Sequence, residues 1–296
     1  MADRQPWHGV IVASALPFTD SLAVDHQALG AHVQFLAAQG CQGVAVNGSL
    51  GEYQVLTDAE RAEVVRTAVA AAPAGFDVMA GVGAYGSAES RSWAEQAASA
   101  GATSVLCLPP IGYRADERSV LAHYREVAAA GLPVVAYNNP YDTRVDLVPE
   151  VLARLHGEGL IVGVKEFSGD PRRVYRTKEL AAELDVLIGA DDTVLEVALA
   201  GASGWIAGYT NVFPASTVRL YEACMAGDLA VAVPMYRALH PLLRWDTTTE
   251  FVQAIKLSMD MVGLRGGGCR PPRQPLLPEQ EAQVRAATEA AISWQG

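Results

Sequence analysis

Long hydrophobic runs are missing from this sequence of 296 residues. No apolar stretch is long enough to cross a membrane, and the opening residues 1–6 lack the apolar core of a signal peptide. Positive charge is scarce too, since 22 Lys and Arg stand against 33 Asp and Glu, which gives a formal net charge of -11. Such a charge argues against nucleic acid or an anionic membrane surface as a partner. We therefore expect a cytoplasmic protein that binds neither nucleic acid nor a membrane.

Closely spaced metal ligands are missing as well. Cys41, Cys107, Cys224 and Cys269 are far apart, and no Cys-x-x-Cys pair occurs. The six histidines are scattered, without the His-x-x-x-His or Glu-x-x-His spacing of helical metal sites. Most of the cysteines lie in apolar or helical surroundings, which favours buried free thiols over disulfides or a zinc site. We expect catalysis without a metal and without a cofactor.

What the sequence has in abundance is an alternation of short β-rich runs with longer helical patterns. Such alternation is typical of parallel βαβ units, and about eight of them predict a closed (β/α)8 TIM barrel, an α/β fold. A doubly wound open sheet is the alternative, weakened because no Gly-x-Gly-x-x-Gly follows the first strand. The predicted strands span residues 9–15, 43–46, 78–82, 104–108, 133–137, 160–165, 185–189 and 204–207.

Beyond Asp228 the predicted strands cease. The triple glycine 266–268 lacks a preceding strand and a following Lys-Ser/Thr, so we expect an ordinary loop there rather than a phosphate cradle. We predict two parts, a catalytic barrel of residues 1–226 and a C-terminal helical region of residues 227–296 packed on it. The helical patterns of the second part cover residues 231–243, 250–262 and 278–292.

Lys165 stands at the end of the apolar run 160–164, which predicts a strand buried on both faces. A lysine at that place either reaches out to water or loses hydration. Lost hydration disfavours the charged form, and a neutral amine condenses with a ketone to give a Schiff base. A surface lysine and a catalytic nucleophile are therefore the two interpretations of this residue.

The C-terminal ends of the strands carry the chemistry in barrels of this kind. Gly48-Ser49-Leu50-Gly51-Glu52 follows the second predicted strand, Tyr137 ends the fifth and Lys165 the sixth. The glycines around Ser49 let backbone N–H groups turn inward, which suits a carboxylate. Tyr137 could pass a proton between a lysine-bound intermediate and the group that leaves or enters. Each motif alone also fits an ordinary turn or a packing residue, but their joint placement predicts an active site.

With these motifs, the sequence resembles the dihydrodipicolinate synthase and N-acetylneuraminate lyase family of Schiff-base lyases over essentially its whole length. The most specific pieces are the 48–52 loop, Tyr137-Asn138-Asn139-Pro140 and Gly163-Val164-Lys165-Glu166. The resemblance implies that Lys165 is the Schiff-base lysine and that Tyr137 handles protons. It also implies a homo-oligomer, a dimer of dimers, that acts on a small 2-oxo or imino acid. The expected substrate-binding residues are Ser49 and Leu50, whose amides and hydroxyl would hold the carboxylate, and Asn139, Asp142, Gly189 and Ile206.

The sequence departs from the lysine-pathway synthases of this family at three positions. Leu50 stands where the family loop often has a second hydroxyl residue. Gly112, next to Tyr113, stands where a relay tyrosine would fall. Asp142 takes the place of an arginine that grips the carboxylate of the aldehyde partner, with Arg144 two residues on. An aspartate cannot replace a guanidinium fork and repels a carboxylate, which disfavours the synthase reaction.

The expected function is that of a Schiff-base lyase that eliminates water or ammonia from a 2-oxo or cyclic 2-imino acid. A Schiff base at C2 makes the lysine nitrogen an electron sink, so that a C–C, C–O or C–N bond can break. Loss of the relay hydroxyls, with Lys165 and Tyr137 retained, favours elimination over condensation.

Specific hypotheses are deamination of hydroxyproline-derived pyrroline-4-hydroxy-2-carboxylate and dehydration, or aldol cleavage, of a 2-keto-3-deoxy acid. Two alternatives stay open. One is 4-hydroxy-tetrahydrodipicolinate synthase of lysine biosynthesis, with Arg144 and Tyr113 standing in for the displaced groups. The other is a non-catalytic barrel that binds a 2-oxo acid.

Overall fold

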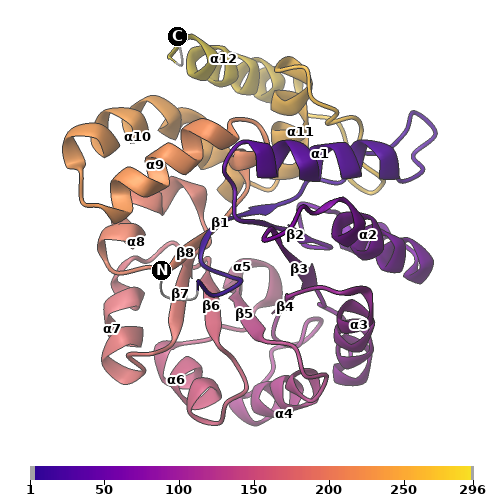
Figure 1. Cartoon of the computed structure of the whole chain (residues 1–296), viewed down its shortest axis with the longest axis vertical. Helices are drawn as coiled ribbons and strands as arrows, with labels where there is room; N and C mark the ends of the chain where they lie inside the picture. Colours follow the sequence, from indigo (N-terminus) through magenta and orange to yellow (C-terminus); the bar gives the residue numbers. More distant parts are fainter. Residues whose placement is uncertain (1–3, 295–296) are drawn as a thin grey trace.

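Eight parallel strands form the centre of the protein in the computed structural model, which describes residues 4–294. They close into a barrel in which each strand pairs with its neighbours in the chain and β1 pairs with β8 (Figure 1). The predicted (β/α)8 barrel is confirmed, and the open-sheet alternative is wrong. The strands are β1 (Gly9–Ala13), β2 (Gly43–Val46), β3 (Asp77–Gly81), β4 (Ser104–Cys107), β5 (Val134–Asn138), β6 (Gly163–Glu166), β7 (Asp185–Ile188) and β8 (Gly204–Ala207).

Both faces of these strands are buried, which is why they read as continuous apolar runs rather than as alternating patterns. All four residues of β2, β4, β6 and β8 are buried. Ile11 and Leu187 point inward and fill the barrel interior, whereas Val12 and Val186 belong to the core between strands and helices. The interior is thus a packed core, and room for a ligand lies at the end of the barrel.

A layer of helices surrounds the barrel (Figure 1). Four short 3-10 turns, η1 (Tyr53–Val55), η2 (Asp191–Thr193), η3 (Tyr209–Asn211) and η4 (Arg244–Thr247), lie in the connections. The helices up to the last strand and just after it are α1 (His26–Ala38), α2 (Asp58–Ala71), α3 (Ser87–Ala100), α4 (Glu117–Ala128), α5 (Pro140–Thr143), α6 (Pro149–Gly157), α7 (Arg172–Leu180), α8 (Val194–Leu199) and α9 (Pro214–Met225).

Several helix boundaries follow local signals in the sequence. α2 begins with a capping box, because Glu60 N–H donates to Thr57 Oγ1 at 3.3 Å and Thr57 N–H donates to Glu60 Oε2 at 2.9 Å. α5 begins inside the Tyr137-Asn138-Asn139-Pro140 motif. It is a single turn that starts at Pro140 and is capped by Asn139, whose Oδ1 accepts from Asp142 N–H at 3.2 Å.

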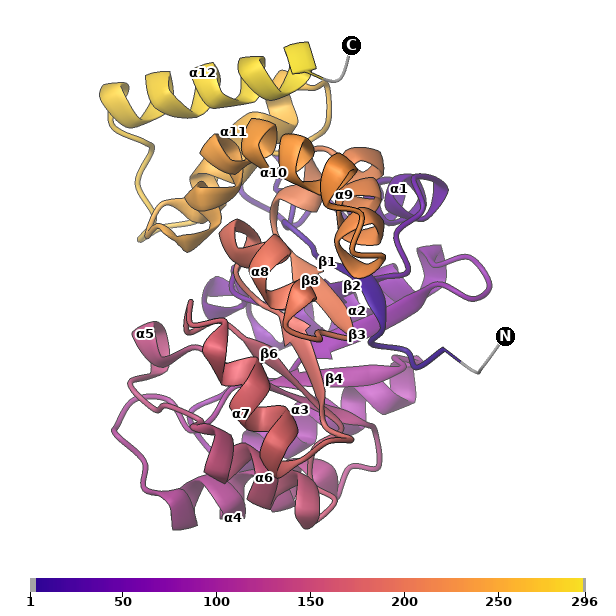
Figure 2. The ribbon, with the colours of Figure 1, turned by 90° about the vertical axis from the view of Figure 1, so that its left-hand side faces the viewer.

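Three further helices follow the barrel: α10 (Leu229–Leu243), α11 (Phe251–Met261) and α12 (Pro278–Trp294). They stack on one side of the barrel, and α12 lies across α10 and α11 (Figure 2). The connection between α10 and α11 reaches back to the strand ends, where Asp191 N–H donates to Asp246 Oδ2 at 3.3 Å. No helix within residues 4–294 has the length and apolarity needed to cross a membrane.

Candidate active site

A cavity of about 840 Å³ opens at the C-terminal ends of the strands. This volume falls in the range of small-molecule sites, and the position is the usual one for active sites in this fold. Its wall brings together the loop after β2, the ends of β5 and β6, η2 and the segment between α10 and α11. Six of the predicted site residues lie in this wall: Ser49, Leu50, Tyr137, Asn139, Asp142 and Lys165.

Lys165 lies in β6 and is only 7% exposed. Its Nζ is 4.6 Å from the centre of the Tyr137 ring and 5.6 Å from that of Phe167. The ion pairs formed within residues 4–294 do not include Lys165. Burial lowers the pKa of this lysine, and the negative charges of Asp246 and Asp191 oppose the shift. Because the side chain is buried, the interpretation of Lys165 as a water-exposed lysine is wrong. A desolvated amine has the chemistry that a nucleophile needs.

Tyr137 faces the same cavity because β5 and β6 pair in a register that places it opposite Lys165. Asn139 Nδ2 donates to the Tyr137 hydroxyl at 3.4 Å. Burial raises the pKa of Tyr137, and the charges of Asp246 and Asp142 raise it further. The phenol therefore keeps its proton in the resting site and is available as a proton donor.

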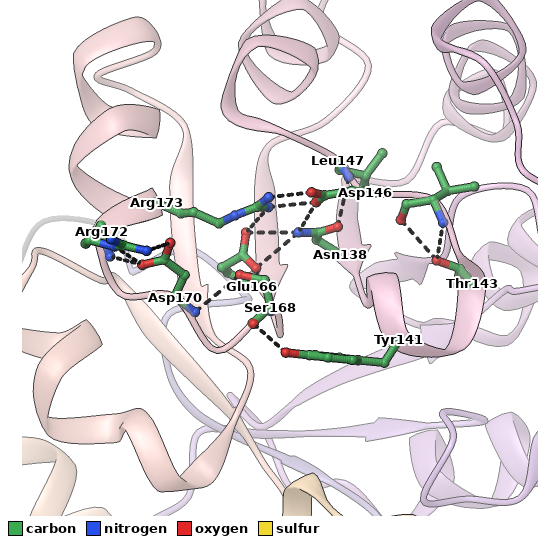
Figure 3. Close-up of polar contacts among 11 residues, drawn as sticks. Asn138, Tyr141, Thr143, Asp146, Leu147, Glu166, Ser168, Asp170, Arg172 and Arg173 are labelled. Atoms are coloured by element: carbon green, nitrogen blue, oxygen red, sulfur yellow. Dashed lines mark hydrogen bonds and ion pairs between the residues drawn. The ribbon is translucent and has the colours of Figure 1, made fainter.

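The residues that follow Tyr137 and Lys165 in their strands form a polar network outside the barrel (Figure 3). Asn138 Nδ2 donates to both carboxylate oxygens of Glu166 at 3.1 Å, and its Oδ1 accepts from Leu147 N–H at 2.9 Å. Ser168 N–H donates to Glu166 Oε1 at 2.7 Å. These bonds tie the ends of β5 and β6 together.

Arg173 completes the network shown in Figure 3. Its guanidinium binds both oxygens of Asp146, at 2.8 Å and 2.5 Å, and lies 3.6 Å from Glu166 Oε2. Burial raises the pKa of Glu166, and its bonds to Ser168 and the charge of Arg173 oppose that shift. Because side chains alternate along a strand, fixing the outward neighbours also fixes the directions in which Tyr137 and Lys165 point.

The loop after β2 contributes Gly48, Ser49 and Leu50 to the wall. Residues in the left-handed region bound it, Asn47 at φ 56° and Glu52 at φ 52°. The amides of Ser49 and Leu50 make no hydrogen bond to the backbone of residues 4–294, so they can donate to a ligand. Such a run of amides is a binding place for an anion.

Gly81, at the end of β3, makes this loop position possible. A Cβ at Gly81 would lie 2.1 Å from the carbonyl oxygen of Asn47. On the other side of the loop, Asn47 Nδ2 donates to the carbonyl oxygen of Arg61 at 2.9 Å. The loop is therefore held by packing against β3 and by a bond to α2.

Two carboxyl groups in the wall, Asp192 and Asp246, were not singled out from the sequence. Burial raises the pKa of Asp192 and raises that of Asp246 well above its usual range, with the charge of Asp191 adding to the latter shift. Asp246 fits because its neighbour is a glycine: a Cβ at Gly208 would lie 2.2 Å from Asp246 Oδ1.

Asp191, which is buried, supports Asp246 from behind the wall. Its carboxylate accepts hydrogen bonds from Tyr209 N–H at 2.7 Å and from the Trp205 indole at 2.9 Å. Burial raises the pKa of Asp191 to about 6. Asp191 and Asp192 come two and three residues after the predicted strand 185–189, so the strand-end rule that selected Lys165 could have found them. No sequence signal marks Asp246, which comes from the connection between α10 and α11.

Other residues discussed from the sequence lie outside the wall. Gly189 packs so closely on β6 that a Cβ there would be 2.3 Å from the carbonyl oxygen of Glu166, and Ile206 belongs to the barrel interior. Their predicted contact with substrate stays a prediction. Tyr113 is 56% exposed and Arg144 caps α5 in the left-handed region, and neither is part of the wall. Arg273, from the segment after α11, is part of it.

Within residues 4–294 there is no group of three or more His, Cys, Asp or Glu side chains that could hold a metal ion. The four cysteines are free thiols, and Cys41, Cys107 and Cys224 are buried. The wall itself combines one amine, carboxyl groups, hydroxyls and free amides. This set can bind a carboxylate, attack a carbonyl carbon and move protons.

Comparison with known proteins agrees with this chemistry. The family model described as "Dihydrodipicolinate synthetase family" matches residues 6–291. A 4-hydroxy-tetrahydrodipicolinate synthase of Methanothrix thermoacetophila is 34% identical, over 94% of this chain and 95% of the relative. An uncharacterized DapA-like lyase of Rhizobium meliloti is 31% identical, over 96% of this chain and 95% of the relative. The crystal structure of dihydrodipicolinate synthase from Aquifex aeolicus superimposes with a TM-score of 0.92 at 28% identity and 98% coverage of both chains.

The TIM barrel, with a buried amine at its mouth, together with these relatives identifies a lyase of the Schiff-base class I aldolase superfamily. The chain belongs to the dihydrodipicolinate synthetase family. Its predicted family and its class, a lyase that uses a lysine Schiff base, are thereby confirmed. The alternative of a non-catalytic barrel is not supported, because the relatives are named as enzymes.

Proposed function

We propose that Lys165 forms a Schiff base with C2 of a 2-oxo or cyclic 2-imino acid and that the protein then eliminates water or ammonia. One observation carries the proposal: the charges around the cavity. Its wall holds the carboxyl groups of Asp142, Asp192 and Asp246. Within residues 4–294, the only basic side chains in the wall are Lys165 and Arg273. Carboxyl groups offer no positive charge to a second substrate carboxylate, but they accept hydrogen bonds from hydroxyl or ammonium groups.

The roles of the residues follow from their places. The substrate carboxylate binds the amides and hydroxyl of the Ser49–Leu50 turn, and Lys165 attacks C2. Water, or the ring amine of a cyclic imine, leaves C2 with a proton from Tyr137 or Asp246. The iminium then acidifies C3; loss of the C3 proton gives an enamine, whose electron pair expels the C4 hydroxyl, which takes up a proton and leaves as water. Water then hydrolyses the Schiff base and frees Lys165. With a cyclic imino acid, the new double bond shifts to C4–C5, and hydrolysis of the resulting imine at C5 releases ammonia. Leu50 supplies no hydroxyl to a condensation relay, which supports elimination over condensation.

Borohydride reduction followed by intact mass tests the proposal. Candidate substrates are pyrroline-4-hydroxy-2-carboxylate, 2-keto-3-deoxy sugar acids, and pyruvate with aspartate semialdehyde. We expect an adduct on Lys165, located by peptide mapping, and turnover of one of the first two classes. An adduct on another residue contradicts the role of Lys165. Turnover restricted to pyruvate with aspartate semialdehyde contradicts elimination.

A synthase is the second candidate, and Arg273 is the observation in its favour. The guanidinium of Arg273 lies in the cavity wall, donates to the carbonyl oxygen of Thr249 at 3.3 Å and forms no ion pair within residues 4–294. It could bind the second carboxylate of an aldehyde partner, a role for which Arg144 is badly placed. The synthase name of the relative from Methanothrix thermoacetophila supports the same candidate.

We further propose that the protein is a homo-oligomer, a dimer of dimers. Tyr85 is 77% exposed, Tyr141 70% and Tyr113 56%. Exposed aromatic side chains grouped near a cavity mouth are typical of interaction surfaces. Light scattering coupled to size exclusion should give four times the mass of one chain, and a monomer would contradict this.

A further inference from the structure

Glu52 and Lys256 form an ion pair inside the protein. Lys256 Nζ lies 2.6 Å from Glu52 Oε1, and each side chain is 1% exposed. Glu52 follows the loop after β2, whereas Lys256 is in α11, 204 positions later in the chain. Neither residue is part of the cavity wall. The pair therefore joins the C-terminal helices to the barrel without touching a bound substrate.

The remaining polar atoms of the pair are occupied. Glu52 Oε2 accepts from the backbone N–H of Arg270 at 3.0 Å, and Lys256 Nζ also donates to the carbonyl oxygen of Gly268 at 2.9 Å. The Lys256 ammonium lies 4.5 Å from the centre of the Phe18 ring. A buried charge pair holds one geometry when its remaining hydrogen bonds are satisfied in this way.

The triple glycine lets the segment after α11 reach this pair. A Cβ at Gly266 would lie 2.0 Å from the carbonyl oxygen of Lys256, so no other residue allows the same approach. The N–H groups of Gly266 and Gly267 donate to Asp260 Oδ1 at 2.8 Å and 3.2 Å. These amides are thus hydrogen-bonded within the protein rather than free for a phosphate, in agreement with the prediction of an ordinary loop.

The position of the pair connects two parts of the cavity wall. Glu52 ends the loop that carries Ser49 and Leu50, and it adopts a left-handed backbone at φ 52° that few non-glycine residues take up. On the other side, Arg270, whose N–H binds Glu52, lies three residues before Arg273 of the wall. Because Glu52 is two residues from Leu50 along the chain, we expect a displacement of Glu52 to move the Ser49–Leu50 turn relative to the rest of the site.

We propose that the Lys256–Glu52 ion pair is a positioning device by which the C-terminal helices set the geometry of the carboxylate-binding loop. A buried ion pair often contributes little to stability compared with an apolar pair but does specify one arrangement. The affinity for an oxo acid thus depends on Lys256, a residue that does not touch it. This inference rests on the proposed role of the Ser49–Leu50 turn, but not on elimination as the reaction.

Pyruvate trapping tests the inference because Schiff-base formation precedes every reaction considered above. The pyruvate concentration that gives half-maximal borohydride adduct is measured by intact mass for the wild type and for K256M, E52Q and K256R. We expect K256M and E52Q to raise that concentration between about tenfold and a hundredfold, the scale of a binding group misplaced by a fraction of an ångström. The adduct at saturation should stay complete, and K256R should restore part of the affinity.

S258A is the matched control. Ser258 is in the same helix, is buried and hydrogen-bonds Thr288 Oγ1 at 2.8 Å, away from the loop. We expect S258A to lower the melting temperature yet leave the half-saturating concentration unchanged. Wild-type affinity in folded E52Q or K256M, or an equal loss of affinity in S258A, would overturn the inference. S49P, which removes both the hydroxyl and the backbone N–H of Ser49, separates the two proposals, because wild-type affinity in folded S49P refutes the carboxylate loop itself.

Discussion

Lys165 and Lys256 are both buried, at 7% and 1% exposure, yet their surroundings differ in one respect. The Glu52 carboxylate lies 2.6 Å from Lys256 Nζ, whereas Lys165 forms no ion pair within residues 4–294. Lys165 instead faces the rings of Tyr137 and Phe167. Its pKa is lowered by burial, with only partial compensation from Asp246 and Asp191.

The difference separates a lysine suited to a structural role from a lysine suited to catalysis. A direct ion pair stabilises the ammonium, so Lys256 is a structural cation. A lysine that is desolvated but not paired holds its proton weakly, and a neutral amine is what Schiff-base formation requires. The lack of a close carboxylate is therefore as important for the proposed role of Lys165 as its place in the barrel.

Replacing the unpaired lysine should have the largest effect on function. We expect Lys165→Ala to abolish both turnover and borohydride trapping, because no other buried amine lines the cavity within residues 4–294. Circular dichroism should show the fold unchanged. A reduced adduct of the alanine variant, seen by intact mass, would assign the nucleophile to another residue.

The stability of the two lysine variants should differ in sign. Lys256→Met leaves Glu52 buried without its cation, so we expect a loss of about 3–5 kcal/mol in the free energy of unfolding. Lys165→Met removes an amine whose pKa is lowered in the folded state, and we expect no loss or a gain in stability. Urea unfolding of both variants measures this. An equal destabilisation would remove the distinction between the two lysines.

Tyr137 is part of the surroundings of Lys165, because its ring lies 4.6 Å from the lysine Nζ. We expect Tyr137→Phe to keep the apolar ring and the covalent adduct but to lose roughly two orders of magnitude in kcat, as for a removed acid–base group. Single-turnover kinetics with separate trapping would show the split. An unchanged kcat would point to Asp246 as the group that moves the proton.

Much of this arrangement could be predicted from the sequence, because local patterns report local structure. The apolar strand patterns placed Lys165 and Tyr137 at one end of a barrel, and the 48–52 glycines indicated a loop with free amides at the same end. Asp246 could not be found in this way. It reaches the site through the packing of α10 and α11 on the barrel and through the space left by Gly208, neither of which has a local signal.

The Lys256–Glu52 pair escaped prediction for the same reason, since its members are 204 positions apart. The family resemblance also implied Gly189 and Ile206, which the structure places beside β6 and in the barrel interior. Position along a strand says which end of the barrel a residue occupies. It does not say whether the side chain reaches the cavity or fills the core below it.

Asp142 should have a smaller effect than Tyr137, because it acts on binding. Its Oδ2 accepts from Asn139 Nδ2 at 2.8 Å, which orients the carboxylate within the wall. If the substrate carries hydroxyl or amine groups, Asp142→Asn should raise KM by about tenfold, the value of one charge-assisted hydrogen bond. Asp142→Arg should nearly abolish binding. A lower KM in the asparagine variant would instead indicate a second substrate carboxylate and favour the synthase.

The smallest expected effect is a shift in pH dependence. It tests whether nearby carboxyl groups set the pKa of Lys165. Lys165 reacts as the neutral amine, so kcat/KM rises with pH through its pKa. Burial lowers that pKa, and the negative charges of Asp246 and Asp191 raise it. Asp246→Asn removes one of these charges, so the pKa of Lys165 should fall further. The rate of pyruvate trapping is measured against pH, because it avoids other proton transfers. The acidic limb of this profile should move to lower pH by up to about one unit, or 1.4 kcal/mol. Burial and the charge of Asp191 raise the pKa of Asp246 well above its usual range, and a proton held on Asp246 makes the shift smaller but cannot reverse its direction. A move of the limb to higher pH would mean that Asp246 does not act on Lys165 through its charge.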